Sequence, residues 1–482
     1  MSRTITTTRG VFGLRRRRGP SPHPGLPANA AGVPLVGEAE GECGFVIAQR
    51  VSGERALPVL GRMVLLSRER LCRHLLVCGA TGSGKTETLL RLAWTVAKES
   101  DAPVFYLDGK GDRETAERFA GLMTDAGRST RVFPDEPFAG WRGEAHEIHS
   151  RLMAIIDYAE DGGASWYRDI AKTVLRLVCE HPDGPPRSAR QLLLGMQLPL
   201  LVRAHPGSTA AAALTEMQVA QVRLRYEAFF GQIRGQLDGE WAWEDTSAGY
   251  VLLDSLTLSE EVGGLARFLF EDFMRYIATR KPRDRFCVLI VDEFSSLARS
   301  ASMAARVEKA RGFRASLILA PQVVEGMGGT VETARILGSV ETVIAHRVNT
   351  PDDIVALAGT RQTPKLTTRI AEDGMTRKGS IHHEQELKID PNKVRNLDPG
   401  MAYIISRGRA MRVQVLRAPD VRGELPEACV PGHGGPVGPG VSAETANTGI
   451  VAPAGEPGEK DLRAGCHVLG GASEKGVGSL PF

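Results

Sequence analysis

The sequence contains no window near the roughly 18–20 continuous apolar residues that a membrane-spanning helix needs. The basic run at residues 15–18 is followed by Gly19-Pro20-Ser21-Pro22 and not by an apolar core, so it does not fit a signal peptide. The sequence therefore predicts a cytoplasmic protein, which reaches the inner face of the cell membrane only through a partner.

Cysteine pairs and excess charge are also missing. The seven cysteines show no C-x-x-C spacing, and Cys78 and Cys287 lie in apolar runs, where a free thiol acts as a small hydrophobe. This cysteine usage fits a reduced compartment. A net charge of +3 is too small to predict a nucleic-acid partner by itself.

What the sequence does contain is a phosphate-binding loop. The apolar run at residues 75–78 enters the pattern G-x-x-x-x-G-K-[ST], and residues 86–94 then have helical character. In this arrangement the loop N–H groups and the helix N-terminus bind phosphate, Lys85 reaches the β- and γ-phosphates, and the Thr86 hydroxyl holds Mg²⁺. The residues expected to bind the nucleotide are Gly79, Ala80, Thr81, Gly82, Ser83, Gly84, Lys85 and Thr86. The expected cofactors are ATP and Mg²⁺.

A second acidic motif completes the pattern of an NTPase. Asp292 and Glu293 follow an apolar run of strand character. A carboxylate at such a strand tip can hold Mg²⁺, and we assign this metal role to Asp292 beside Thr86. Glu293 is placed to orient or deprotonate the attacking water. The pair favours hydrolysis over nucleotide binding alone.

Other polar residues follow predicted strands or lie near the acidic pair. Gln322 ends the next strand, where its amide can sense the γ-phosphate or position water. Asp108, Lys110 and Asp112 follow the strand after the first helix, at the sheet edge where ligands bind in parallel sheets. Three arginines on or after the helix that follows Glu293 are candidates to act on a neighbouring subunit's nucleotide: Arg306, Arg311 and Arg314.

Alternating strand and helix patterns predict an α/β fold with a mainly parallel sheet. Residues 36–136 and 248–420 are assigned to this sheet domain, and residues 137–247 to an all-α insertion with helices that include one over Ser188–Leu200. Residues 361–390 are polar and are expected to form a loop, and residues 402–415 a hairpin. Residues 1–35 and 421–482 are expected to be disordered because their composition is basic or rich in Gly and Pro.

Several motifs together resemble one family. Residues 73–86 (RHLLVCGATGSGKT) look like the nucleotide loop of type IV secretion coupling proteins, the TraG/TraD-type motors of bacterial conjugation within the FtsK–HerA group of DNA pumps. Residues 107–112 (LDGKGD) are similar to the family's second signature, with Gly109 in place of its usual Pro. Residues 291–294 (VDEF), 319–322 (LAPQ) and 398–403 (DPGMAY) resemble later segments of the motor core. The resemblance covers residues 44–418.

The resemblance implies a RecA-like P-loop ATPase with an all-α insertion, assembled as a hexamer that threads DNA, in which Arg311 acts in trans. The implied function is an ATP-hydrolysing DNA translocase that serves as a conjugative coupling protein. The implied partners are DNA, further copies of the chain, a membrane-anchored or secretion-channel protein and a relaxase-type protein. Membrane-anchored family members begin with transmembrane helices, which this sequence does not show.

Alternative functions remain open on the residues alone. These are a HerA-like translocase or helicase in DNA processing, a non-hydrolysing ATP-switched adaptor for protein substrates, and a coupler for protein export. The direction of translocation and the preference for single- or double-stranded DNA are not encoded in any of these motifs.

Overall fold

The computed structural model describes residues 36–39, 42–52, 59–158, 164–253, 261–283, 285–296, 301–371 and 374–425. The N-terminal segment predicted to be disordered, residues 1–35, and residues 426–482 of the predicted tail lie outside these ranges. No helix in the described ranges is long and apolar enough to cross a membrane.

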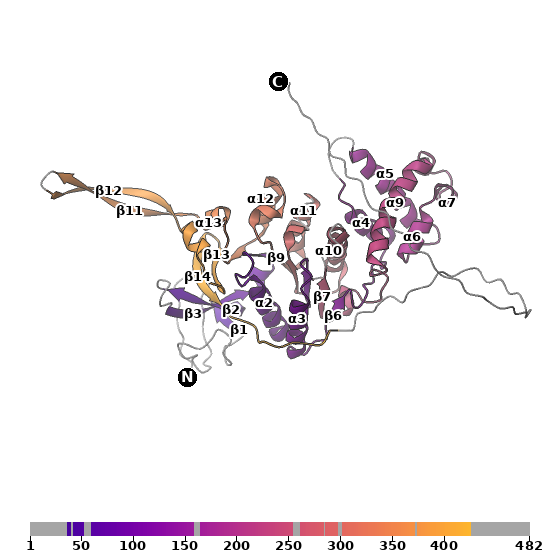
Figure 1. Ribbon diagram of the computed structural model, residues 1–482. Coiled ribbons are helices and arrows are strands. Elements are labelled where there is room, and N and C mark those ends of the chain that lie inside the picture. The colour runs from indigo at the N-terminus through magenta and orange to yellow at the C-terminus, as the bar shows by residue number, and fades with distance from the viewer. Residues whose placement is uncertain are drawn as a thin grey trace, which may run out of the picture. The chain divides into compact units, whose positions relative to one another are not determined.

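A mixed, mostly parallel sheet of 12 strands organises the described chain (Figure 1). Its order is β1-β2-β14-β13-β10-β4-β9-β8-β5-β7-β6, with β3 paired to β2. The strands are β1 (Val36–Ala39), β2 (Glu42–Ser52), β3 (Val59–Ser67), β4 (Leu75–Cys78), β5 (Val104–Asp108), β6 (Arg131–Phe133), β7 (Ala248–Leu252), β8 (Cys287–Asp292), β9 (Ala315–Ala320), β10 (Thr342–Ala345), β13 (Met401–Ser406) and β14 (Arg409–Val415). The run from β10 to β6 is parallel, which confirms the predicted α/β class.

The central strands are buried on both faces, because their apolar residues alternate between two cores. In β4, Leu75 and Val77 belong to one core, and Leu76 and Cys78 to the other. The first core is covered by α1 (Arg68–Leu71), α2 (Lys85–Glu99) and α3 (Arg113–Asp125). The second is covered by α10 (Glu261–Thr279), α11 (Ala301–Ala310), α12 (Thr330–Ser339), α13 (Asp352–Ala358) and α14 (Pro391–Arg395). Short 3₁₀ helices are η1 (Trp243–Asp245), η2 (Phe294–Ser296), η3 (Arg311–Phe313) and η4 (Val324–Met327).

A group of helices is inserted in the chain between the neighbouring parallel strands β6 and β7. They are α4 (Ala145–Ile155), α5 (Ala164–Cys179), α6 (Ala189–Gly195), α7 (Leu198–Ala204), α8 (Thr209–Ala212) and α9 (Glu216–Ile233). The helix expected over Ser188–Leu200 is two helices, since α7 begins anew with Pro199 in its first turn. A buried ion pair between Arg151 and Asp272 joins α4 to α10. The boundaries proposed for a separate insertion domain stay a prediction.

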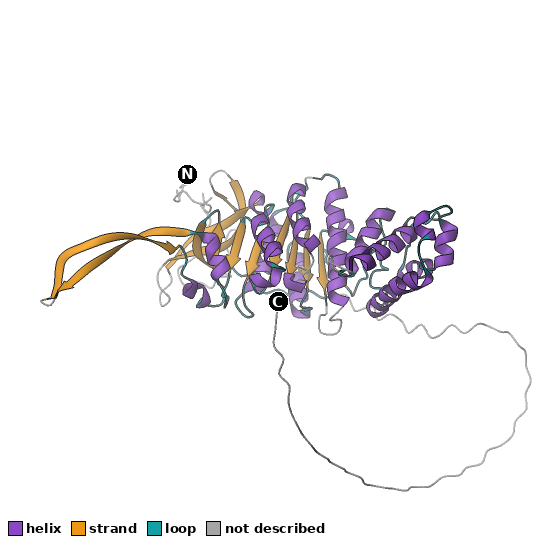
Figure 2. Cartoon of the chain, turned by 90° about the horizontal axis from the view of Figure 1, so that it is seen from above, coloured by secondary structure: helices purple, strands orange, loops and turns teal. Residues whose placement is uncertain are grey.

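The prediction of a loop at residues 361–390 is wrong. This segment forms a two-stranded antiparallel ribbon of β11 (Thr360–Ala371) and β12 (Gly374–Leu387), which extends away from the main sheet (Figure 1; Figure 2). Threonine favours extended backbone. Where burial is described, at residues 360–365 and 383–387, most of the ribbon is exposed. A polar sequence there indicates exposure and not the absence of strands. The hairpin predicted over residues 402–415 is confirmed as β13 and β14.

Candidate functional site

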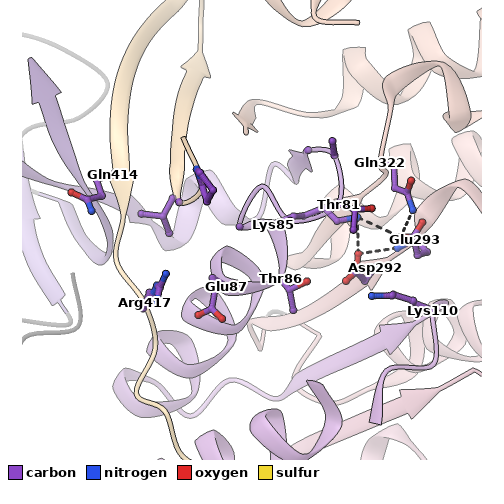
Figure 3. Close-up of a pocket in the computed structure, with 17 residues that line it drawn as sticks. Thr81, Lys85, Thr86, Glu87, Lys110, Asp292, Glu293, Gln322, Gln414 and Arg417 are labelled. Carbon is purple, nitrogen blue, oxygen red and sulfur yellow. Dashed lines mark hydrogen bonds and ion pairs between the residues drawn. The ribbon is translucent and has the colours of Figure 1, made fainter. Parts of the chain in front are cut away.

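The phosphate loop, residues 79–86, joins the end of β4 to the start of α2 (Figure 3). A Cβ at Gly79 would lie 2.4 Å from Ser83 Oγ and 2.7 Å from His346 Cβ, so this close approach requires glycine. Gly84, with a φ of 102°, is the N-cap of α2, and no side chain in the described ranges caps the first helical N–H groups. These N–H groups can therefore bind an anion.

Segments distant in sequence hold the phosphate loop and α2 in place through hydrogen bonds. Gly400 N–H donates to the Ser83 carbonyl at 2.9 Å. The buried His346 ring contacts Thr88 Oγ1 through Nε2 at 2.8 Å and the Met401 carbonyl through Nδ1 at 3.0 Å. Burial lowers the pKa of His346 to about 4, so the neutral ring donates from Nδ1 and accepts at Nε2. Neither His346 nor Gly400 was predicted; the sequence signal for His346 is only its place directly after an apolar strand.

The Lys85 ammonium group lies between the loop and the strand tips. Its Nζ is 3.0 Å from Asp292 Oδ1 and 3.8 Å from Glu293 Oε1, and it donates to the Ala320 carbonyl at 3.1 Å. Strands β8 and β9 pair in parallel with Asp292 opposite Ala320, which brings both strand ends to the same edge. The structure therefore places the predicted lysine against the predicted acidic pair.

Glu293 is the first residue after β8 and adopts a left-handed backbone conformation with a φ of 56°. For a glutamate this conformation is strained, and such strain is concentrated at functional sites. The Glu293 N–H donates to Asp292 Oδ1 at 3.0 Å, and Gln322 Nε2 donates to Glu293 Oε1 at 2.8 Å. The structure thus brings Gln322 to the acidic pair, from the segment after β9.

Asp108, the acidic residue that ends β5, has different hydrogen-bond partners from those of Asp292. Asp108, 2% exposed, accepts hydrogen bonds from the N–H groups of Lys110 and Asp112 at 2.9 and 2.8 Å and from the Tyr250 hydroxyl at 2.8 Å. Burial raises the pKa of Asp108, although these three donors oppose the shift. The Asp112 side chain caps α3 by accepting from the Glu114 N–H. Of the three residues expected here, only Lys110 lines the pocket.

The pocket beside the phosphate loop has a volume of about 370 Å³ (Figure 3). The pocket is lined by all the predicted loop residues except Ser83, which is buried, and by Lys110, Asp292, Glu293 and Gln322. It is also lined by residues that were not predicted: Glu87, Pro399, Gly400, Gln414, Val415 and Arg417. Most of these lie just before β13 or at and after the end of β14, more than 300 residues after the loop in sequence. A bidentate ion pair with Arg118 occupies the Glu87 carboxylate. Arg417 has no ion pair with any residue that the structure describes.

The three candidate arginines lie away from this pocket. Arg306, on α11, pairs with Glu271 on α10. Arg311 begins η3 and is exposed, and Arg314 ends it with a φ of 51°. None of them lines the pocket of its own subunit. This placement is compatible with action on a neighbouring copy and does not by itself select Arg311.

The donors at the pocket suit magnesium. The Thr86 hydroxyl and the Asp292 carboxylate are hard oxygen ligands, and both residues line the pocket. No cluster of three or more His, Cys, Asp or Glu side chains suited to a metal occurs in the described ranges. The pocket therefore offers few protein ligands, as expected where Mg²⁺ arrives with phosphates and water.

Comparisons with known proteins find a matching family model, a sequence relative and similar solved structures. The family described as "Helicase HerA-like C-terminal" matches residues 59–126. The type 4 coupling protein DotL of Legionella pneumophila is 24% identical over 124 residues. That alignment covers 26% of this chain and 16% of DotL, so it spans only a small part of the relative.

The fold is similar to that of the bacterial conjugative coupling protein TrwB, with a TM-score of 0.60 at 17% identity over 76% of this chain and 89% of that chain. TrwB in complex with ADP and Mg²⁺ gives a TM-score of 0.58 at 17% identity, over 83% and 98% of the two chains. VirB4 of Thermoanaerobacter pseudethanolicus gives 0.52 at 14% identity, over 79% and 98%. These matches confirm the RecA-like P-loop fold and the predicted resemblance to type IV secretion coupling proteins of the FtsK–HerA type.

Proposed function

We propose that this chain is an ATP-hydrolysing DNA motor that acts as a conjugative coupling protein. The observation that carries the proposal is the convergence of Lys85, Asp292 and Glu293 at one strand edge beside the phosphate loop. A loop that only binds nucleotide does not need a strained glutamate beside its lysine. The similarity to TrwB and DotL supports the coupling role.

Each residue has a defined part in the proposed reaction. Lys85 binds the β- and γ-phosphates. Thr86 and Asp292 would hold Mg²⁺, which would supply neutralisation of charge on the transferred phosphoryl group. Glu293 accepts a proton from the water that attacks the γ-phosphorus, and ADP leaves. Gln322 donates to Glu293 Oε1 and so keeps the carboxylate oriented toward that water.

The assembly belongs to the same proposal. Homo-hexamers would form nucleotide sites between copies, with Arg311 completing the site of the neighbour, and DNA would pass through the ring. A membrane-anchored or secretion-channel protein would receive the DNA, and a relaxase-type protein would deliver it. The similar fold of TrwB, which is described as a bacterial conjugative coupling protein, supports the conjugative role that this assembly would serve.

A second candidate is a HerA-like translocase or helicase in DNA processing, which is favoured by the family match to residues 59–126. It shares the chemistry and differs in the process served. The ATP-switched adaptor for protein substrates is disfavoured, because it gives no role to the contact between Glu293 and Gln322.

The test is steady-state ATP turnover by the full chain, with and without single- and double-stranded DNA. We expect DNA to stimulate turnover, and Glu293→Gln and Lys85→Ala to abolish it. Binding of ATP without turnover under every DNA condition would contradict the motor and favour the adaptor. Turnover that no DNA stimulates would contradict the DNA-motor role while leaving the ATPase in place.

A further inference from the structure

The two carboxylate oxygens of Asp292 have different partners. Oδ1 lies 3.0 Å from Lys85 Nζ and accepts the Glu293 N–H at 3.0 Å, so it belongs to the pocket. Oδ2 accepts a hydrogen bond from the Tyr106 hydroxyl at 2.9 Å. Tyr106 is fully buried, and it lines no part of the pocket. The tyrosine can therefore act on the site only through Asp292.

The position of the Tyr106 hydroxyl is fixed by packing on the neighbouring strand and helix. Its ring stacks on Tyr250 with centroids 5.0 Å apart and an interplanar angle of 16°, and meets Phe119 of α3 edge-on at 5.8 Å. In the sheet, Tyr106 lies opposite Ile290 of β8, two residues before the aligned pair Asp108 and Asp292. A ring held on these sides cannot follow a rotating carboxylate, so the hydrogen bond restrains the carboxylate.

We propose that Tyr106 is a positioning residue for the metal site: it holds Asp292 Oδ2 so that Oδ1 stays turned toward Lys85 and the pocket. This inference rests on the proposed function, because it assigns Asp292 to Mg²⁺. Hydrogen bonds donated to a metal-ligating carboxylate fix its orientation and tune the affinity for the metal.

The chain supplies a matched control in Tyr250. It is the stacking partner of Tyr106 and is also fully buried, and its hydroxyl donates to a carboxylate at 2.8 Å. That carboxylate is Asp108, which lies outside the pocket. Tyr250→Phe therefore removes the same atom from the same aromatic pair without touching Asp292.

The experiment measures Mn²⁺ binding by electron paramagnetic resonance in the presence of the non-hydrolysable analogue AMP-PNP, using the full chain. Tyr106→Phe should weaken Mn²⁺ binding by about 10–100-fold, the usual effect of removing a hydrogen bond to a metal-ligating group. The Mn²⁺ affinity of Tyr250→Phe should stay close to that of wild type. Binding of AMP-PNP without metal should be equal in all three proteins. Thermal unfolding of both variants checks that losing a hydroxyl from the stacked pair has matched effects on the fold.

A second readout uses the Mg²⁺ dependence of ATP turnover. In Tyr106→Phe we expect the Mg²⁺ concentration for half-maximal turnover to rise and the maximal rate to recover at high Mg²⁺, a pattern that a general folding defect does not give. Equal Mn²⁺ affinity in Tyr106→Phe and wild type, or equal losses in Tyr106→Phe and Tyr250→Phe, would overturn the inference. Failure of wild type to bind AMP-PNP would instead overturn the proposed function, and the inference with it.

Discussion

Asp108 and Asp292 end two neighbouring parallel strands and lie directly opposite each other in the pairing of β5 with β8. Both are almost fully buried, and each accepts a hydrogen bond from a buried tyrosine. Their remaining partners differ. Asp292 Oδ1 accepts one N–H, from Glu293, and also faces Lys85 and the pocket, whereas both oxygens of Asp108 accept N–H groups of the loop that follows it.

This difference shows that the carboxyl edge of a parallel sheet is a necessary but not a sufficient condition for chemistry. An acidic residue at that edge becomes available to a ligand when its oxygen atoms face a cavity. It becomes part of the scaffold when backbone donors occupy both oxygen atoms and neither faces the pocket, as in Asp108. Asp108 has a scaffold role, and its loop delivers Lys110 to the pocket.

The largest expected effect separates the two aspartates in catalysis. Asp292→Ala should lower ATP turnover by about 10²–10³-fold, since it removes a preorganised charge at the site of phosphoryl transfer. Asp108→Ala should keep turnover within about tenfold of wild type, because only the Lys110 loop is loosened. The measurement is turnover at saturating ATP and Mg²⁺. Comparable losses in the two variants would break the comparison.

Asp108→Ala should also lower the stability of the fold. Asp108→Ala leaves the Lys110 and Asp112 N–H groups and the Tyr250 hydroxyl without their acceptor, at a cost of about 1–3 kcal/mol in the free energy of unfolding. Urea unfolding of wild type and of Asp108→Ala, fitted in the same way, measures this difference in the free energy of unfolding. A variant as stable as wild type would show that the loop does not depend on Asp108.

The same variant gives a pH dependence of known sign. Because burial raises the pKa of Asp108 above its ordinary value, the folded protein binds this proton more tightly than the unfolded chain does. The stability advantage of wild type over Asp108→Ala should therefore be greatest below the ordinary pKa and decline as pH rises through the raised pKa. Buried histidines contribute equally to both proteins and cancel in the difference. An advantage that grows with pH in this range would mean that the three donors outweigh burial.

A double-mutant cycle sharpens the scaffold role of Asp108. Lys110→Ala should weaken ATP binding by about tenfold, the effect of one charge-assisted contact. If Asp108 acts on the nucleotide only by placing Lys110, the double variant should be no weaker than Lys110→Ala alone. Fluorescent-nucleotide titration measures all four proteins. Fully additive losses would give Asp108 a separate contact with the ligand.

The smallest expected effect lies at the far end of the pocket, at Arg417. This exposed side chain follows β14 and lines the pocket beyond the phosphate loop. Arg417→Ala should weaken ATP binding by about threefold, the modest value typical of an exposed polar contact. Binding of inorganic tripolyphosphate, which lacks base and ribose, should be unchanged. Equal losses for both ligands would place Arg417 at the phosphates.

The sequence predicted the parts of the site that are local in the chain. The phosphate loop, the strand that ends in Asp292 and Glu293, and Gln322 after the next strand are each readable from a few residues, and the structure brings them together. Their catalytic roles stay predictions. The sequence left open whether Asp108 faces the nucleotide or the loop beside it, because a strand-end position does not reveal which donors reach a carboxylate.

The contributions from distant segments could not be predicted. Gly400, His346 and Arg417 approach the phosphate loop only because β10, β13 and β14 continue the sheet on that side, and no local pattern links them to it. The β11–β12 ribbon was missed for a different reason. Its polar composition was interpreted as a loop, while its strands depend on pairing with each other.

The central claim is that Glu293 performs the hydrolytic step at a site that Lys85 and Asp292 complete. The most direct test is rapid-quench measurement of ATP hydrolysis in Glu293→Gln, with nucleotide binding measured on the same protein. Glutamine keeps the size of the side chain and can still accept from Gln322, but it cannot take a proton. We predict wild-type affinity for Mg²⁺·ATP with hydrolysis slowed by about 10²-fold or more, the share that general-base catalysis typically supplies. Hydrolysis by Glu293→Gln at the wild-type rate would contradict the account.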